Sequence, residues 1–332
     1  MAVLYVKEQG AYIQKQGERL IVTKKKNTLL DIPIIQVENV SVIGNVQITT
    51  QAMHMMMEQG IDISYFTYSG KYIGHASADS SKNIFLRFEQ YQIYLDLERR
   101  LQMARKIVDN KIQNQMAIIR NCRFQGTDYD WKADVQQMEK YRLTLPERNT
   151  SNEILGVEGI CSNIYFRAFG HMLKCDISFH GRNRRPPRDP VNVIISLAYT
   201  LLTKEMCGLL EAESLEPYLG FLHGIRYGRK SLALDMIEEF RQPAIDRLVI
   251  LLFNKGMIGK YDFEFTEEGS VLLSEEGFHK FCTEYERWMT GKNSLSGEHS
   301  FRGCMKNQIA GLKRTICKGE VYRPYCWIER KE

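Results

Sequence analysis

The spacing of apolar residues changes once along this chain of 332 residues. Up to about residue 75, apolar residues form short runs that Gly, Pro, Asn or Asp interrupt, which is typical of β-strands. Residues 77–84 are mostly small and polar. Beyond them, apolar residues recur every three or four positions, which is the period of an amphipathic helix. The sequence therefore predicts an α+β protein with a β-rich N-terminal domain and a larger all-α domain.

The change in spacing also predicts the domain limits. The N-terminal β-domain is expected to span residues 1–76, the linker 77–84 and the α-helical domain 85–332. Within the β-domain, residues 50–58 form one amphipathic segment with a Thr before it and Gly60 after it, so we expect a single crossover helix there. The same period predicts helices in the second domain over residues 83–120 (one or two helices), 134–141, 152–169, 190–208, 232–253, 274–289 and 299–318.

Composition narrows the class of protein. The apolar content of 44% and the charged content of 26% are those of an ordinary globular protein. The longest apolar runs, 193–202 and 248–253, are shorter than the ~18 residues that cross a bilayer, and the first residues do not resemble a secretory signal. The 8 cysteines form no Cys-x-x-Cys pair and follow no zinc-ligand spacing, which favours free thiols in a reducing compartment. We therefore expect a cytoplasmic protein.

A histidine followed by acidic residues marks the segment 219–243. His223 precedes Asp235 and Glu238, which are three positions apart and would share one face of a helix. A carboxylate pair near an imidazole can hold a divalent cation for phosphodiester chemistry. The alternative is that the acids only favour the positive end of a helix dipole and that His223 is a half-buried, hydrogen-bonded residue. Local spacing leaves both interpretations open.

A second acid and a basic segment add to this pattern. Glu158 stands between Gly156 and Gly159, where the small neighbours leave the backbone open to a ligand, although an ordinary surface glutamate is equally compatible. Asp189 precedes Pro190 and is expected to cap a helix. Arginine suits bidentate contact with phosphate, and the net charge of +5 permits a polyanionic partner, although such a run can also be a solvated loop. Four arginines lie within seven residues: Arg182, Arg184, Arg185 and Arg188.

Taken in order, these motifs resemble those of the metal-dependent DNA integrase of CRISPR spacer acquisition, CRISPR-associated protein one. The resemblance covers most of the chain. The motifs that carry the resemblance most strongly are Leu155-Gly-Val-Glu158-Gly, the segment Arg182 to Asn192, Gly220-Phe-Leu-His223, and Leu232-Ala-Leu-Asp235-Met-Ile-Glu238-Glu-Phe-Arg241. The segments 110–115 and 254–256 are similar to weaker family motifs.

The resemblance implies a site and a reaction. Glu158, His223 and Glu238 would be the metal ligands for Mg²⁺ or Mn²⁺, and Asp235 would support them as a fourth catalytic residue. Many relatives carry aspartate where Glu238 stands, so this longer side chain would have to fold back or bind through water. In the implied reaction, the 3′-hydroxyl of a short DNA fragment attacks a phosphodiester of a CRISPR array. The residues implied in contacts with DNA phosphates are Arg182, Arg184, Arg185, Arg188, Arg226, Arg229, Lys230 and Arg241.

The resemblance also implies partners: double-stranded DNA, a second copy of the chain bound through the N-terminal half, and a small CRISPR adaptor protein that bridges two dimers. Two other functions remain open at this stage. One is a structure-selective endonuclease that hydrolyses branched DNA with the same acids. The other is a non-catalytic nucleic-acid-binding module in which the acids form internal ion pairs.

Overall fold

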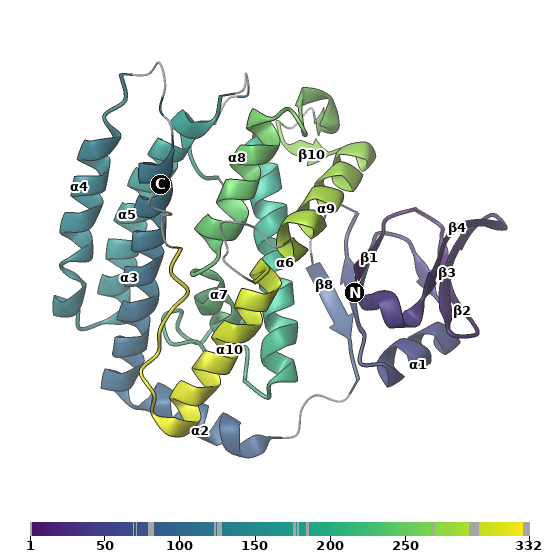
Figure 1. Ribbon diagram of the computed structural model, residues 1–332, viewed down its shortest axis with the longest axis horizontal. Helices are drawn as coiled ribbons and strands as arrows, with labels where there is room; N and C mark the ends of the chain where they lie inside the picture. Colours follow the sequence, from purple (N-terminus) through teal and green to yellow (C-terminus); the bar gives the residue numbers. More distant parts are fainter. Residues whose placement is uncertain are drawn as a thin grey trace.

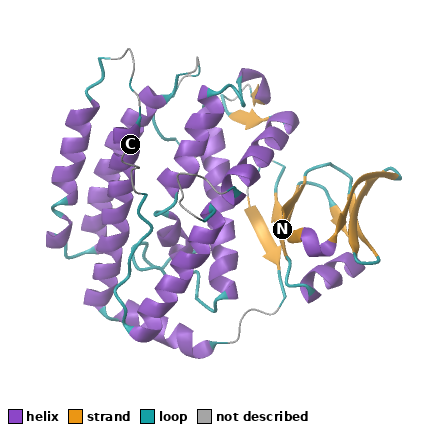
Figure 2. Ribbon diagram, viewed as in Figure 1, coloured by secondary structure: helices purple, strands orange, loops and turns teal. Residues whose placement is uncertain are grey.

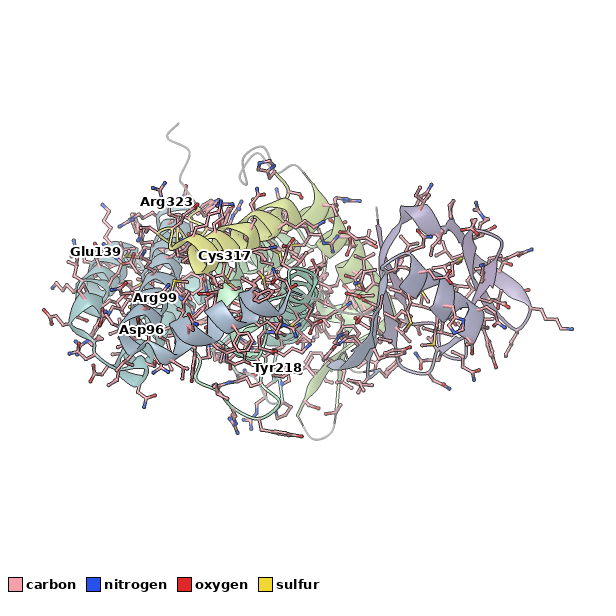
Figure 3. The ribbon with its side chains drawn as sticks, turned by 90° about the horizontal axis from the view of Figure 1, so that it is seen from below. Asp96, Arg99, Glu139, Tyr218, Cys317 and Arg323 are labelled. Atoms are coloured by element: carbon pink, nitrogen blue, oxygen red, sulfur yellow. The ribbon has the colours of Figure 1, made fainter. Side chains whose placement is uncertain are left out.

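The computed structural model describes residues 2–68, 70, 72–78, 83–122, 124, 128–174, 177, 179–183, 186–266, 269–291 and 299–327. The N-terminal strands gather at one end of the molecule and the long helices fill most of the rest (Figures 1 and 2). Seen from below, the two parts lie side by side (Figure 3). The predicted order, a β-rich region followed by a larger helical region, is confirmed.

The N-terminal part contains two four-stranded sheets. One has the order β1-β5-β7-β8, in which only the β7–β8 pair is antiparallel, and the other has the order β4-β3-β2-β6. Alternate residues such as Ile13, Leu20 and Val22 are buried, as expected of strands with one face on a core. The strands are β1 (Ala2–Val6), β2 (Tyr12–Gln16), β3 (Arg19–Lys24), β4 (Asn27–Pro33), β5 (Val37–Ile43), β6 (Gln47–Ile48), β7 (Asp62–Phe66) and β8 (Tyr72–Ala76).

Helix α1 (Thr50–Glu58) is the predicted crossover helix, and it packs against β2 and β7. The hydroxyl of Thr49 caps it by accepting a hydrogen bond from the backbone of Ala52 at 3.3 Å. Gly60 follows with a φ of +67°, a conformation that favours glycine. The helix start and stop signals in the sequence are therefore confirmed here.

The helical part follows the predicted segments closely because most helix ends carry local capping residues. The segment 83–120 is divided into two helices at Asp96, whose carboxylate accepts a hydrogen bond from the backbone of Arg99. Asp189 caps the helix that begins at Pro190, as predicted, by accepting a hydrogen bond from the N–H of Asn192 at 2.8 Å. The helices are α2 (Ile84–Leu95), α3 (Leu97–Asn121), α4 (Trp131–Arg142), α5 (Ser151–Met172), α6 (Pro190–Ala212), α7 (Ser231–Ile237), α8 (Arg247–Asn254), α9 (Glu275–Thr290) and α10 (Phe301–Lys318).

Two predictions about this part are wrong. The segment 232–253 is not one helix: α7 ends at Ile237, a turn follows, and Arg241–Asp246 is a π-helical segment before α8. The cause is Pro243, which has no N–H to donate and whose ring crowds the carbonyl four residues earlier. The domain is also not all-α, because β9 (Phe263–Phe265) and β10 (Val271–Leu273) form a short antiparallel pair.

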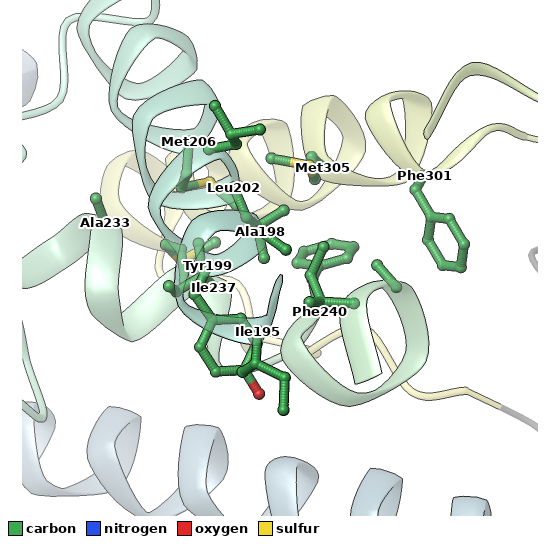
Figure 4. Packing of buried hydrophobic residues seen from close by; sticks show 14 of the residues in the cluster. Ile195, Ala198, Tyr199, Leu202, Met206, Ala233, Ile237, Phe240, Phe301 and Met305 are labelled. Atoms are coloured by element: carbon green, nitrogen blue, oxygen red, sulfur yellow. The ribbon is translucent and has the colours of Figure 1, made fainter. Parts of the chain in front are cut away.

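Helix α6 is the centre of the helical core. Its residues Ala198, Leu202 and Met206 face α7 and α10 (Figure 4). By length and composition α6 is apolar enough to cross a membrane, with a mean hydropathy of 1.5 over 18 residues, but 61% of that window is buried inside the protein. No other helix in the described residues has this character. Ile43 and Phe66 of the first sheet belong to the same core, so the two parts share packing.

Candidate active site

One buried ammonium group joins two of the predicted ligands. Nζ of Lys111, on α3, contacts the carboxylate of Glu158 on α5 and lies 2.6 Å from Oε2 of Glu238, in the turn after α7. The side chain of Lys111 is 6% exposed and that of Glu238 is 5% exposed. The structure therefore brings the carboxylates of Glu158 and Glu238, far apart in sequence, into contact with one cation.

The charges of this cluster determine its protonation. Burial raises the pKa of Glu238, but the cations Arg241 and Lys111, with His223, outweigh it and hold the pKa at about 2. Burial also opposes ionisation of Glu158, yet Lys111 and a hydrogen bond from the Ser162 hydroxyl at 2.8 Å lower its pKa overall. Both carboxylates are therefore ionised near neutral pH, which is the form that binds a metal ion.

His223 is held by Asp235. The Nδ1 atom of its ring lies 2.6 Å from Oδ1 of Asp235, which is fully buried. The same carboxylate accepts backbone hydrogen bonds from Phe221 at 2.5 Å, Leu222 at 2.9 Å and His223 at 3.0 Å. Asp235 therefore fixes both the loop 220–223 and the histidine ring. With Nδ1 engaged, Nε2 is the ring nitrogen that remains for a ligand, which is the usual arrangement of metal-binding histidines.

Gly220 allows the loop to approach so closely. A Cβ atom at this position would lie 2.7 Å from Oδ2 of Asp235 and 2.7 Å from the backbone of Ser231, closer than real Cβ contacts. The Gly-Phe-Leu-His motif thus has a direct physical reason. Glycine lets the backbone pass close to the carboxylate of Asp235, and this path places His223 beside that carboxylate.

The side chains of Glu158, Glu238 and His223 are of the types that bind a hard divalent cation. Carboxylate oxygens with one imidazole suit Mn²⁺ or Mg²⁺. In the part of the chain that the structure describes, no three His, Cys, Asp or Glu side chains form a ready metal cage. Instead, Lys111 lies between the two carboxylates and supplies the positive charge that they require.

A second cluster supports Glu238 from the other side. Arg241 lies 3.2 Å from Oε1 of Glu238 and packs over the ring of Tyr199, 4.6 Å from its centroid. Arg182 packs over the same ring at 5.7 Å. The hydroxyl of Tyr199 donates to Asp246 at 2.6 Å, and burial raises the pKa of this carboxyl to about 6. Glu238 thus lies between two fixed cations, Lys111 and Arg241.

The comparison with protein families decides the identity of the fold. The family model for CRISPR associated protein Cas1 matches residues 4–287. The chain belongs to the Cas1 family. CRISPR-associated endonuclease Cas1 3 of Thermus thermophilus is 37% identical over 289 residues, which cover 86% of this chain and 84% of the relative. CRISPR-associated endonuclease Cas1 1 of Chlorobaculum tepidum is 30% identical over 339 residues, with 98% of each chain covered.

Solved Cas1 structures have the same fold. A CAS1 protein from Thermotoga maritima superposes with a TM-score of 0.84 at 24% identity, over 97% of this chain and 99% of that one. A casposase bound to its integration product gives a TM-score of 0.84 at 22% identity, over 98% and 93% of the two chains. A Cas6-RT-Cas1–Cas2 complex gives 0.83 at 22% identity, over 99% of this chain and 36% of that one. The family predicted from the sequence is confirmed.

The residues that the Cas1 resemblance assigned to DNA lie in different surroundings. Arg188 is exposed, and Arg229 lies in the loop after His223, where it donates to the carbonyl of Gly224. Arg182 donates to Asn192 at 2.6 Å. Lys230 has a side chain 17% exposed and faces the Tyr72 ring of the β-rich part. Arg241, 12% exposed, is paired inside the site, whereas Arg184 and Arg185 lie outside the described residues.

Sequence reasoning missed the contribution of α3 to this candidate site. Lys111 was only part of a weak landmark, yet it joins the two acids. Gln115 donates to the hydroxyl of Ser162 at 3.2 Å, and Ser162 in turn donates to Glu158. A signal was available: Asn110, Lys111, Asn114 and Gln115 are polar residues within an otherwise apolar stripe of a buried helix, where each needs a partner.

Proposed function

We propose that this chain is a DNA integrase and endonuclease of CRISPR spacer acquisition, which inserts short DNA fragments by attack of a 3′-hydroxyl on a phosphodiester. One observation carries the assignment to this site: Glu158 and Glu238 converge on a single buried cation, beside a histidine whose Nδ1 is fixed. The names of the relatives and the casposase fold support the same reaction class.

Glu158, Glu238 and Nε2 of His223 would hold Mg²⁺ or Mn²⁺. When bound, the ion stabilises the negative charge that develops on the phosphate oxygens. Because Lys111 contacts both carboxylates, its ammonium would compete with a divalent ion for their oxygens. Arg241 stays beside Glu238 and holds its carboxylate in place. Asp235 keeps the proton of His223 on Nδ1, so that Nε2 presents a lone pair.

Partial exposure of two proposed ligands gives DNA a route to the site. The side chains of Glu158 and His223 are each 21% exposed. Arg188 and Arg226 are exposed, and such arginines bind phosphates without regard to sequence. We infer that the phosphate at the cleavage point enters between Glu158 and His223.

A strand-joining assay tests the proposal. A labelled fragment with a free 3′-hydroxyl is incubated with a supercoiled target and Mn²⁺, and we expect a joined, labelled product. Glu158→Gln and His223→Ala should each abolish joining while DNA binding persists. Glu153→Gln is the matched control, because Glu153 is an exposed acid at the start of the same helix, and it should join normally.

The same assay separates the alternatives. Release of cut fragments without joining would identify a branched-DNA endonuclease that uses water in place of the 3′-hydroxyl. Binding with neither product, unaffected by Glu158→Gln, would identify a non-catalytic module.

Partners and location extend the proposal. We infer a homodimer formed through the N-terminal half, double-stranded spacer and repeat DNA as ligands, a small adaptor protein of the Cas2 kind, and a cytoplasmic location. The Cas1–Cas2 complex of similar fold supports the adaptor. Sedimentation at micromolar concentration tests the dimer, since a monomer at that concentration would exclude it.

A further inference from the structure

The segment after α10 lies against the active-site helix α3. Helix α10 ends at Lys318, and Gly319 after it has a φ of 66°, which turns the chain back. Residues 319–327, which we call the strap, contain no helix or strand and run alongside α3 (Figure 1). Arg323 of the strap and Cys317 of α10 lie on the same face of the molecule (Figure 3). Lys106 on α3 donates to the carbonyl of Tyr322 at 3.3 Å.

The strap holds Glu239, the neighbour of the proposed ligand Glu238. The hydroxyl of Tyr322 donates to Oε1 of Glu239, and the backbone N–H of Tyr325 donates to Oε2 at 2.7 Å. Gln308 on α10 donates to Oε2 at 2.7 Å as well. Glu239 is fully buried, so these donors satisfy a carboxylate that is shielded from water. Nothing in the reaction proposed above uses this acid.

Asn114 holds the strap and the turn together. Its Oδ1 accepts from the backbone of Trp327 at 2.9 Å, and its Nδ2 donates to the carbonyl of Tyr325 at 3.1 Å. The same Nδ2 donates to the carbonyl of Glu239 at 3.0 Å. That carbonyl lacks the helical hydrogen bond that residue 243 would supply, because residue 243 is proline. Asn114 therefore replaces a bond that the π-helical segment cannot make.

These contacts converge on the short turn 238–240, which lies between α7 and the π-helical segment. On one side, Lys111 and Arg241 contact the carboxylate of Glu238. On the other side, the ring of Tyr325 stacks on Phe240, with centroids 4.9 Å apart and planes at 14°. Since Lys111 and Asn114 are three positions apart on α3, one helix face serves both sides of the turn.

We propose that the strap is a working part of the active site, in which Asn114 and Tyr322 are positioning residues that hold the turn 238–240 so that Glu238 presents its carboxylate to the metal ion. This inference rests on the proposed function, because it assumes that Glu238 is a ligand. The partners that orient metal ligands commonly change metal affinity by 10- to 100-fold when they are removed.

The test measures Mn²⁺ affinity directly, by electron paramagnetic resonance of free Mn²⁺ in titrations of the full chain without DNA. We expect Tyr322→Phe and Asn114→Ala each to raise the dissociation constant at least about tenfold. Joining should slow at low Mn²⁺ and recover when Mn²⁺ is in excess, because only ligand placement has changed. The matched control is Tyr5→Phe, which removes a hydroxyl that donates to Glu286 at 2.9 Å, outside the site.

Each result decides. An unchanged dissociation constant in both variants would overturn the proposal, and a lower melting temperature with unchanged Mn²⁺ affinity would show that the strap supports only the fold. Tyr322→Phe removes a single oxygen atom, so this variant can test the proposal by itself if Asn114→Ala does not fold. If Glu158→Gln joins DNA normally, the proposed function itself fails. If Glu158→Gln is inactive and the strap variants bind Mn²⁺ normally, only the strap inference fails.

Discussion

Nζ of Lys111 lies 2.6 Å from Oε2 of Glu238 and holds this carboxylate beside that of Glu158. The single positive charge of the ammonium reduces the repulsion between two acids in a poorly solvated site. The proposed divalent ion would bind the same carboxylates, so we expect it to compete with Lys111. This relationship links the stability of the metal-free protein to its affinity for the ion.

Lys111→Met tests this competition. Without metal, the variant leaves Glu158 without its cation and Glu238 with Arg241 alone, and we expect it to lose about 3 kcal/mol of unfolding free energy. Added Mn²⁺ should raise its melting temperature more than that of the unmodified protein, because the ion no longer displaces an ammonium. Thermal unfolding with and without Mn²⁺ provides the measurement. Equal increases in the two proteins would show that Lys111 does not occupy the metal position.

Asp235→Asn tests the positioning of His223. An amide oxygen can still accept hydrogen bonds, but the amide loses the negative charge that holds the proton on Nδ1. We expect Mn²⁺ affinity and the joining rate each to fall by about 10- to 100-fold. Asp189→Asn is the matched control, since Asp189 caps α6, and it should leave Mn²⁺ affinity unchanged. Normal Mn²⁺ binding by Asp235→Asn would contradict this role.

Gly220→Ala tests the wrap of the loop around Asp235. The added Cβ would lie 2.7 Å from Oδ2 of this residue, so the loop must shift. We expect a loss of about 1–3 kcal/mol of unfolding free energy and joining too slow to detect. Gly74→Ala in β8, where a Cβ would meet nothing within 4 Å, is the control. If Gly220→Ala joins DNA at the normal rate, the close approach has no functional importance.

The arginines should divide into two groups by salt dependence. Arg188 is exposed, so Arg188→Ala should lower the slope of log affinity against log salt by about 1. Arg182 is bonded to Asn192 at 2.6 Å and to Ser196 at 3.0 Å. Arg182→Ala should therefore lower the unfolding free energy by about 1–3 kcal/mol with little change in slope. Binding titrations at several salt concentrations, with melting curves, would reveal a reversed pattern.

Lys204 gives a pH dependence at the junction of the two parts. Burial lowers its pKa to about 8 in the folded protein, from 10.5. Between these values the unfolded chain binds more protons, so the unfolding free energy rises with pH, by up to about 3 kcal/mol from this group. Lys204→Met should lack this rise, and urea unfolding at pH 8 and pH 10.5 measures the difference. Parallel pH dependences in the two proteins would refute the assignment.

Much of the fold could be predicted because its signals are local. Thr49 and Asp189 cap their helices through bonds to residues three positions away, and such bonds follow from sequence alone. The π-helical segment could not be predicted from the sequence. Pro243 indicates that a regular helix is interrupted, but it does not determine which conformation replaces the helix. The strands β9 and β10, each of three residues, are too short to show the alternation of apolar and polar residues that predicts a strand.

The site shows the same division. His223, Asp235 and Glu238 share one stretch of sequence, and the family resemblance added Glu158. The contact of Lys111 with two acids depends on the packing of α3 against α5, which no local pattern records. The role of Asp235 could not be predicted from the sequence either, because three of its hydrogen-bond donors are backbone N–H groups of a loop. Sequence motifs thus predicted these candidate residues but not their contacts.

The position of the strap also has a consequence for synthesis. Residues 319–327 are made after every proposed ligand, so a polypeptide that stops before Tyr322 carries the acids and the histidine without the bonds that Tyr322 and Trp327 supply. A chain shortened in this way is therefore expected to carry the proposed ligands with the turn 238–240 less firmly held.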